Sequence, residues 1–268
     1  MNCRAMHGFF QFRFVRLLFF SVVFFIFSVS VFAAAPQPAD NFSFLVFGDN
    51  RDGDEVYLEL INKVNTEENI AFVVHVGDFV ALGKASEYKQ YLKLEAGLKH
   101  KVYHVMGNHD AVYGGWQRFN QYFGNAAYSF DYQNSHFIVV DNSFDRRLTA
   151  AQLDWLQKDL SATPAKNIFV FLHRPLFDPA GLMASHVMES QTKADRLRRL
   201  FEKHKVTAVF AGHIHGFEKT QLSGVTYIIT GGAGSPLYLP QFMGGYFHYV
   251  RVTVRGDRVD YAVKRVYD

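Results

Sequence analysis

Short apolar runs alternate with longer amphipathic segments along the chain from residue 41 onward. The apolar runs have the length and the β-branched and aromatic content of strands. They cover residues 42–47, 71–76, 102–106, 128–132, 136–140, 168–172, 206–210, 225–230, 247–254 and 258–263. Segments with helical spacing of apolar residues cover 54–66, 86–98, 116–123, 150–160 and 192–203. This alternation predicts a layered α/β domain, and we expect Thr149 to cap the fourth helix.

The order of these elements changes along the chain. Strands and helices alternate in the first half, whereas the part after residue 225 contains strands separated by glycine-rich turns. We therefore predict an α/β fold in which two mixed β-sheets pack as a sandwich and are flanked by α-helices. Residues 178–190 show no clear periodicity and are a candidate active-site loop or cap.

Residues 1–35 differ from the rest of the chain, because they contain three arginines and no acidic residue. The arginines precede an apolar stretch at 17–32, and small residues follow at 33–35. This order predicts a signal peptide over 1–35 and a folded domain over 36–268, and the cleaved form would begin near Ala34. The apolar stretch is shorter than the roughly 20 residues of a membrane span, so an uncleaved N-terminal membrane anchor is the alternative. In both cases we expect export, to the periplasm if the source is bacterial.

The charge of the chain favours some partners over others. Its formal value of +3 comes from the N-terminal segment, since 25 basic and 25 acidic residues remain without it. A balanced charge with no basic run does not indicate a nucleic-acid partner. The only cysteine, Cys3, precedes the apolar stretch, so the mature protein would contain no disulfide. Its stability would then depend on its core or on a bound metal ion.

Polar residues that can bind a metal ion follow five of the predicted strands, where open α/β sheets place their ligands. They lie in GDNR (48–51), GD (77–78), GNHD (107–110), at His173 and in GHIH (212–215). Any one of them alone is best explained as a turn residue or a helix cap, but their convergence without a cation would be costly. Carboxylate, amide and imidazole groups together favour Mn, Fe or Zn over Ca or Mg.

The ordered set GD, GD, GNHD, His and GHIH resembles the calcineurin-like metallophosphoesterase family from Phe44 to roughly Tyr249. The resemblance implies a phosphoric ester hydrolase with one or two divalent transition-metal ions, Mn, Fe or Zn. It also implies that hydroxide activated by the metal attacks phosphorus. The metal ligands that it implies are Asp78 as the bridge, Asp49 and His215 for the first ion, and Asn108, His173 and His213 for the second.

The GNHD segment also carries the catalytic roles that the resemblance implies. His109 would stabilise the transition state or protonate the departing oxygen, and Asp110 would orient the His109 ring. Asn108 is expected to contact the substrate as well as a metal ion. Arg174, Tyr113, Trp116 and His186 could line the substrate pocket, but each is equally well explained as a loop residue. The remaining histidines, His75 among them, are interpreted as structural.

Arg51 departs from the family pattern, which usually has histidine two residues after the first aspartate. A guanidinium cannot bind a cation, because it is always protonated and has no acceptor. Ala81 stands where purple acid phosphatases have a tyrosine, so no iron–tyrosinate centre is expected. Three interpretations remain open: a first ion completed by water, a mononuclear enzyme in which Arg51 replaces part of the missing charge, or an inactive relative. Our hypothesis is that Arg51 contacts the substrate phosphate.

These observations predict an exported metal-dependent phosphoesterase with a small phosphorylated substrate. The motifs do not distinguish a monoester from a diester, since loops make that choice. One alternative is a non-catalytic binding or scaffold protein with a degraded metal site. Another is a membrane-anchored enzyme that acts on lipid phosphates, with membrane contact only through an uncleaved N-terminal segment.

Overall fold

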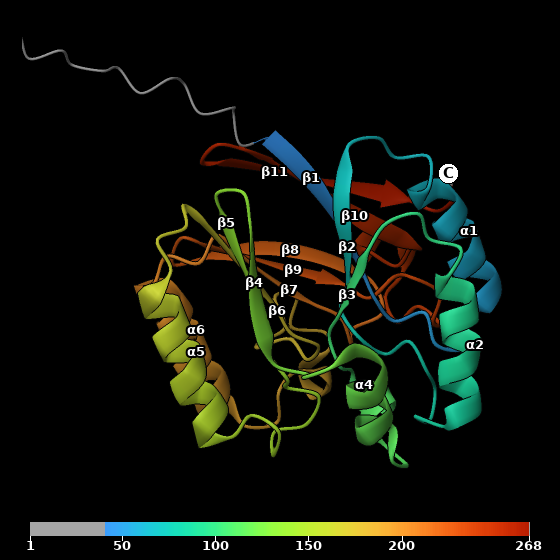
Figure 1. Cartoon of the computed structure of the whole chain (residues 1–268), viewed down its shortest axis with the longest axis horizontal. Helices are drawn as coiled ribbons and strands as arrows, with labels where there is room; N and C mark the ends of the chain where they lie inside the picture. Colours follow the sequence, from blue (N-terminus) through green and yellow to red (C-terminus); the bar gives the residue numbers. More distant parts are fainter. Residues whose placement is uncertain (1–40, 268) are drawn as a thin grey trace, which may run out of the picture. The chain divides into compact units, whose positions relative to one another are not determined.

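The computed structural model describes residues 41–267, and its strands form two sheets (Figure 1). The five-stranded sheet has the order β11-β10-β1-β2-β3. Its strands are β1 (Asn41–Phe47), β2 (Ile70–His75), β3 (Val102–His104), β10 (His248–Arg255) and β11 (Arg258–Arg265). Strands β1, β2 and β3 run parallel, whereas β10 is antiparallel to both β1 and β11. This sheet is therefore mixed.

The second sheet has six strands in the order β4-β5-β6-β7-β9-β8. They are β4 (Tyr128–Tyr132), β5 (Ser135–Val139), β6 (Asn167–Phe171), β7 (Ala208–Ala211), β8 (Phe217–Leu222) and β9 (Val225–Thr230). The central strands β5, β6, β7 and β9 run parallel, and antiparallel strands close both edges. Parallel strands end at the same edge of a sheet, which brings the loops after β6 and β7 together.

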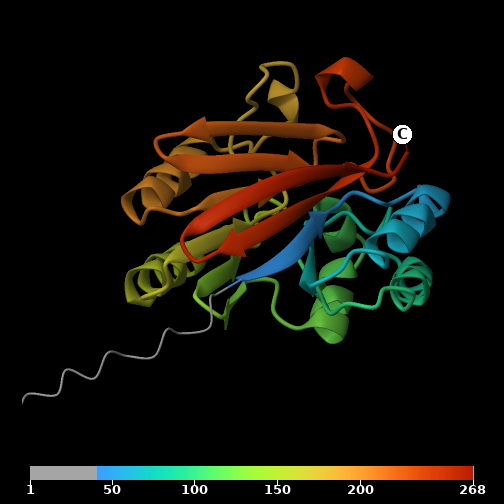
Figure 2. The same cartoon turned by 90° about the horizontal axis from the view of Figure 1, so that it is seen from above.

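Helices cover the outer faces of the two sheets (Figures 1 and 2). Helices α1 (Asp54–Val64), α2 (Ala85–Glu95) and α4 (Gly115–Phe123) pack on the five-stranded sheet, and α5 (Ala150–Ala162) and α6 (Gln191–Lys203) pack on the six-stranded sheet. Side chains alternate between the faces of a strand, so Phe44 of β1 enters the inter-sheet core and Leu45 packs on the helix side. Both faces are buried, which explains why β1 is apolar from Phe44 to Phe47.

The predicted fold class, two mixed sheets packed as a sandwich with flanking helices, is confirmed. All ten predicted strands and five predicted helices are present, with shifted ends, and Thr149 caps α5 by accepting a hydrogen bond from the Gln152 amide at 3.2 Å. Strand β8 was not predicted, because its polar, partly exposed residues at the sheet edge lack a strand pattern. The structure also contains short helical segments, α3 (Asn108–Ala111), η1 (Ala184–His186) and η2 (Gln241–Met243).

The predicted signal peptide or anchor lies outside the described residues. Among residues 41–267, no helix is both long enough and apolar enough to cross a bilayer.

Candidate active site

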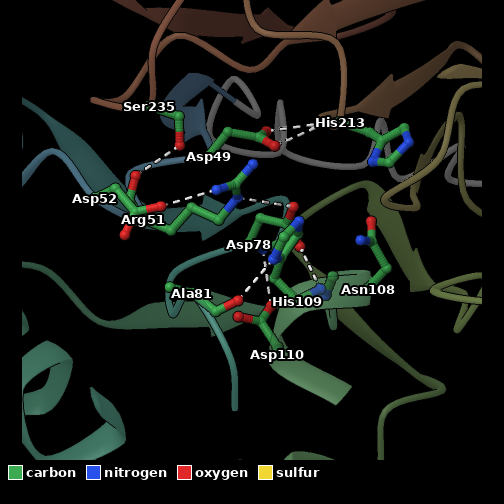
Figure 3. Close-up of polar contacts among 12 residues, drawn as sticks. Asp49, Arg51, Asp52, Asp78, Ala81, Asn108, His109, Asp110, His213 and Ser235 are labelled. Atoms are coloured by element: carbon green, nitrogen blue, oxygen red, sulfur yellow. Dashed lines mark hydrogen bonds and ion pairs between the residues drawn. The ribbon is translucent and has the colours of Figure 1, made fainter. Parts of the chain in front are cut away.

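The polar segments predicted from the sequence meet where the parallel strands of both sheets end. Asp49 follows β1, Asp78 follows β2, and Asn108 begins α3 after β3. His173 follows β6, and the segment with His213 and His215 follows β7. The close-up shows Asp78 between Arg51 on one side and Asn108 on the other, with His109 beside it (Figure 3). Residues more than 160 positions apart thus share one site, since the His213 amide donates to both Asp49 carboxylate oxygens at 3.0 Å.

The backbone that carries these side chains is strained at three positions. Asp49, Asp78 and His213 have φ angles of 62°, 57° and 67°, in the left-handed region that residues other than glycine seldom adopt. Such conformations persist only where the surrounding structure imposes them, and they concentrate at functional sites. Two glycines allow the close packing of these turns. A Cβ at Gly107 would overlap the Asp78 carboxylate, and one at Gly212 would overlap the Asp49 carboxylate.

Four side chains converge as a metal-binding set. The Nε2 atom of His173 lies 3.1 Å from Asn108 Oδ1, 3.2 Å from His213 Nδ1 and 3.3 Å from Asp78 Oδ1. A Zn²⁺-like ion about 2.1 Å from tetrahedral ligands holds them roughly 3.4 Å apart, so these separations fit one ion. Asp78, His173 and His213 could hold that ion with three ligand atoms all within 4.8 Å of one another. Two imidazoles, a carboxylate and an amide oxygen are consistent with the expected Mn, Fe or Zn.

Backbone carbonyls orient the imidazoles of three site histidines. His173 Nδ1 lies 2.8 Å from the Val76 carbonyl, His215 Nδ1 lies 2.7 Å from Pro236, and His109 Nδ1 lies 2.6 Å from Ala81. A carbonyl only accepts, so each of these Nδ1 atoms carries a proton, and in the neutral ring the opposite Nε2 has the free lone pair. Bonds of this type fix the ring orientation in metal sites.

Burial and mutual charge set the protonation of the four-residue set. Burial alone would raise the pKa of Asp78, but the charge of His173 holds it well below its usual range. Burial alone would lower the pKa of His173, and Asp78 raises it to about 9. Burial and the neighbouring His173 lower the pKa of His213 to about 2. A carboxylate binds a metal ion in its ionised form and an imidazole in its neutral form. A cation that binds here therefore displaces the His173 proton.

Asp49 and His215, which the resemblance assigns to the first ion, form a smaller set beside Asp78. Asp49 Oδ1 lies 3.6 Å from His215 Nε2, and both side chains are buried. Burial, together with the charge of Asp78, raises the pKa of Asp49 above its usual range. Arg51 lies against this set, with its Nε 3.6 Å from Asp78 Oδ2 and its Nη1 2.9 Å from Asp52 Oδ2. A permanent cation therefore stands beside the Asp78 carboxylate.

The role predicted for Asp110 is wrong. Its Oδ2 accepts from the amides of Gly107 at 2.7 Å and Asp78 at 2.8 Å, and its Oδ1 accepts from those of Phe79 and Val80 at 2.9 and 3.1 Å. Four donors leave no oxygen facing the His109 ring, whose orientation comes from the Ala81 carbonyl. Burial raises the pKa of Asp110 to about 7, and these donors oppose that shift. Asp110 is thus a positioning residue for the turn that carries Asp78.

Three further residues shape the site and were not singled out from the sequence. Asn142 Oδ1 accepts from the amide of His173 at 2.8 Å. His75 Nε2 lies 2.7 Å from Asn50 Oδ1, and it fixes the loop between Asp49 and Arg51. Tyr238 stacks on the His215 ring with centroids 4.0 Å apart. These roles depend on contacts between distant segments, so no local motif marks them.

The loop at 178–190 approaches the site as expected for a candidate active-site loop. The His186 ring centroid lies 5.9 Å from that of His213 and 5.1 Å from that of Tyr238. Trp116 instead packs on the core between the five-stranded sheet and its helices. The Arg147 guanidinium lies 4.3 Å from the centroid of the Trp116 ring. Tyr113 is 73% exposed.

The two-sheet fold and the converging carboxylate, amide and imidazole donors define a metal-binding α/β protein of the metallophosphoesterase type. Comparison with protein families gives the same answer, because the family model described as calcineurin-like phosphoesterase matches residues 42–217. The chain belongs to the calcineurin-like phosphoesterase family.

Similar proteins support this assignment over part of their length. The chain is 29% identical over 114 residues to Fe(3+)-Zn(2+) purple acid phosphatase 12 of Arabidopsis thaliana, a match that covers 41% of this chain and 24% of the relative. It is 27% identical over 166 residues to the probable glycerophosphodiester phosphodiesterase GpdQ of Arcobacter nitrofigilis, covering 55% of this chain and 58% of that protein. The chain thus spans about a quarter of the first relative and little more than half of the second.

The fold is also similar to solved structures. The purple acid phosphatase PPD1 from yellow lupin seeds superposes with a TM-score of 0.73 at 18% sequence identity. The match covers 87% of this chain and 53% of that one. At this identity the likeness shows the shared two-sheet architecture.

Proposed function

We propose that this protein is an exported metal-dependent phosphoesterase that hydrolyses a small phosphate ester. The observation that carries the proposal is the convergence of Asn108, His173 and His213 on Asp78, with His109 adjacent to them. The His109 amide donates to Asp78 Oδ1 at 3.0 Å, so the imidazole is anchored next to the proposed metal ligands. Hydrolysis adds the oxygen of water to phosphorus and breaks the bond to the leaving oxygen. A divalent ion in this set would supply Lewis acidity and would lower the pKa of a water molecule.

His109 is suited to the acid step of this reaction. Its Nδ1 is engaged by the Ala81 carbonyl, which leaves Nε2 as the nitrogen that can give a proton to the departing oxygen. The side chain is only partly buried, so a substrate can reach it. No covalent link between substrate and protein is required.

Arg51 is proposed to contact the substrate phosphate. Its Nε is buried and forms no hydrogen bond within the described chain, since 3.6 Å from Asp78 is too long. A phosphoryl oxygen beside Asp78 could accept from this donor, and the planar guanidinium suits phosphate geometry.

A cavity next to Arg51 is proposed to receive the leaving group. It has a volume of about 490 Å³ and lies beside α2, and Arg51 and Ala81 line both the cavity and the site. Its size suits a small molecule. Asp52, Asp54 and Glu87 also line it, and these carboxylates disfavour a polyanionic leaving group. The cavity therefore favours an ester of a small neutral or cationic alcohol.

Turnover assays with the purified protein test the activity. We expect Mn²⁺-dependent hydrolysis of an aryl phosphomonoester or an aryl phosphodiester, and loss of that turnover in Asp78→Asn. In His109→Ala we expect a loss of roughly 100-fold or more, and a larger loss for esters of poorly acidic alcohols, because these need the proton most. Arg196→His, an exposed change on α6, serves as the control. Folded, metal-loaded protein without turnover of either ester would contradict the proposal and favour the non-catalytic binding protein.

Export is proposed from residues 1–35 alone. Fractionation of cells that express the full chain, followed by N-terminal sequencing, tests it. A soluble exported form that begins near Ala34 would support a cleaved signal peptide. An intact N-terminus in the membrane fraction would instead support the anchored alternative, and protein retained in the cytoplasm would contradict export.

A further inference from the structure

Arg51 lies between two of the carboxylates that the family resemblance assigns to the first metal ion. Its Nε is 3.6 Å from Asp78 Oδ2, and the close-up shows its guanidinium between Asp49 and Asp78 (Figure 3). The side chain is only 16% exposed, and Nη1 is held by Asp52 at 2.9 Å. A buried guanidinium in this position cannot withdraw into solvent without breaking that contact.

The donor sets on the two sides of Asp78 differ in completeness. On one side, Asn108 Oδ1, His213 Nδ1 and Asp78 Oδ1 each lie 3.1 to 3.3 Å from His173 Nε2, and the four atoms form a four-donor set. On the other side, the carboxylate and imidazole donors among residues 41–267 are Asp49 and His215, because Arg51 and Ala81 stand where the family pattern has further ligands. Neither residue has a side-chain acceptor for a cation.

The negative charge on the incomplete side is already partly compensated. Asp49 and Asp78 are two buried carboxylates, and Arg51 supplies a positive charge between them. A divalent ion beside a fixed guanidinium would be repelled, because a low-dielectric site screens little of that repulsion.

We propose that Arg51 takes the place of the first metal ion, so that the protein binds one divalent ion, through Asp78, Asn108, His173 and His213. This inference rests on the ligand roles of the proposed function. Arg51 then supplies the second positive charge that faces the phosphoryl group. In a dinuclear site, the other metal ion supplies that charge. Asp49 and His215 serve as the buried surroundings of Arg51 and not as metal ligands.

Metal stoichiometry tests the proposal independently of turnover. The purified full chain is titrated with Mn²⁺ in a calorimeter, and bound manganese is counted after gel filtration. We expect one tightly bound ion per chain, and an electron paramagnetic resonance spectrum of isolated Mn²⁺. In Arg51→His, which restores an imidazole and removes the guanidinium, we expect a second ion bound at least tenfold more tightly than any second ion in the wild type, with a spin-coupled spectrum.

Arg196→His is the matched control, because it adds a histidine to the exposed face of α6 and should leave one ion per chain. Two ions of similar affinity in the wild type would overturn the proposal, and this result does not depend on the folding of any variant. A single ion in both the wild type and folded Arg51→His would also overturn it, since Arg51 would not be the cause. Absence of tight Mn²⁺ binding would contradict the ligand roles themselves, whereas one bound ion without turnover would contradict only the proposed activity.

Discussion

At the residue scale, Asp110 shows how a charged side chain can build a metal site without entering it. Its two oxygens accept four backbone amides, from Gly107 before α3 and from residues 78–80 after β2. These bonds hold the turn in which Asp78 has a positive φ angle. The acceptor-only carboxylate is suited to this place, because every group that faces it is a donor.

We predict that Asp110→Asn destabilises the protein by about 3 kcal/mol. One oxygen would be replaced by an NH₂ group that faces amide donors, and hydrogen bonds to a charged group contribute roughly 1.5–3 kcal/mol each. Urea denaturation of the metal-free protein measures the change. Asp154→Asn, at an exposed position of α5, is the control and should change stability by less than about 0.5 kcal/mol. Equal stabilities of the two variants would show that the four bonds do not hold the turn.

The polar residues that converge in the candidate site could be predicted from the sequence, whereas their supporting partners could not. Asp49, Asp78 and His173 each follow a recognisable apolar strand, so local pattern and motif order were enough to find them. Most partners of Asp110 and His109 are backbone groups of the turn at residues 78–81, and backbone groups leave no signature in a sequence. For the same reason nothing local indicates that Asn142 holds His173.

At the element scale, α5 shows a helix whose beginning is encoded by a single residue. Thr149 has extended backbone angles, and its hydroxyl accepts from the Gln152 amide, one of the donors that a helix start leaves unpaired. The apolar residues Leu153, Leu156 and Leu160 then pack on the six-stranded sheet. The cap therefore fixes where the packed face begins.

We predict that Thr149→Ala destabilises the protein by about 1 kcal/mol, because the Gln152 amide loses its partner. Thermal and urea denaturation measure the difference from the wild type. Thr149→Ser keeps the hydroxyl and should retain most of the stability. If alanine and serine have the same effect, the capping bond contributes nothing and the loss comes from side-chain packing.

The elements that were predicted correctly have a hydrophobic period that burial imposes on the sequence. The elements that were missed have no such period. Buried strands such as β1 and β6 are apolar on both faces, and helices such as α5 carry an apolar stripe, so burial leaves a clear period. Strand β8 lies at a sheet edge with polar, exposed residues, and its pairing with β9 comes from tertiary context. Helix α3 spans only Asn108–Ala111, too short to show a helical period.

At the scale of the whole molecule, the two sheets are joined by an aromatic core and by a few buried polar bonds. Phe44 of β1 packs edge-on against Phe137 and Phe169 of the opposite sheet, with centroids 5.3 and 5.1 Å apart. His248 of β10 forms a polar link, because its Nε2 lies 3.1 Å from the Thr230 hydroxyl at the end of β9. Its Nδ1 lies 2.8 Å from the Tyr246 carbonyl. The neutral imidazole satisfies both partners.

This link makes the stability of the sandwich sensitive to acid. Burial lowers the pKa of His248 to about 4, whereas an unfolded histidine titrates near 6.5. Above pH 6.5 both states are neutral, and the contribution of His248 to stability is fully present. As the pH falls from 6.5 to 4 the unfolded state takes up a proton that the native state does not bind, so stability is lost by up to about 3 kcal/mol.

The unfolding free energy of metal-free protein, measured in urea between pH 4 and 7.5, tests this link between the sheets. In His248→Asn, whose amide can still donate to Tyr246, we expect a flatter pH dependence than in the wild type, since one titrating group is gone. Thr230→Val is the control: it removes the hydroxyl partner but keeps the imidazole, so stability should fall while most of the pH dependence remains. An identical acid slope in the wild type and His248→Asn would assign the acid sensitivity to other groups.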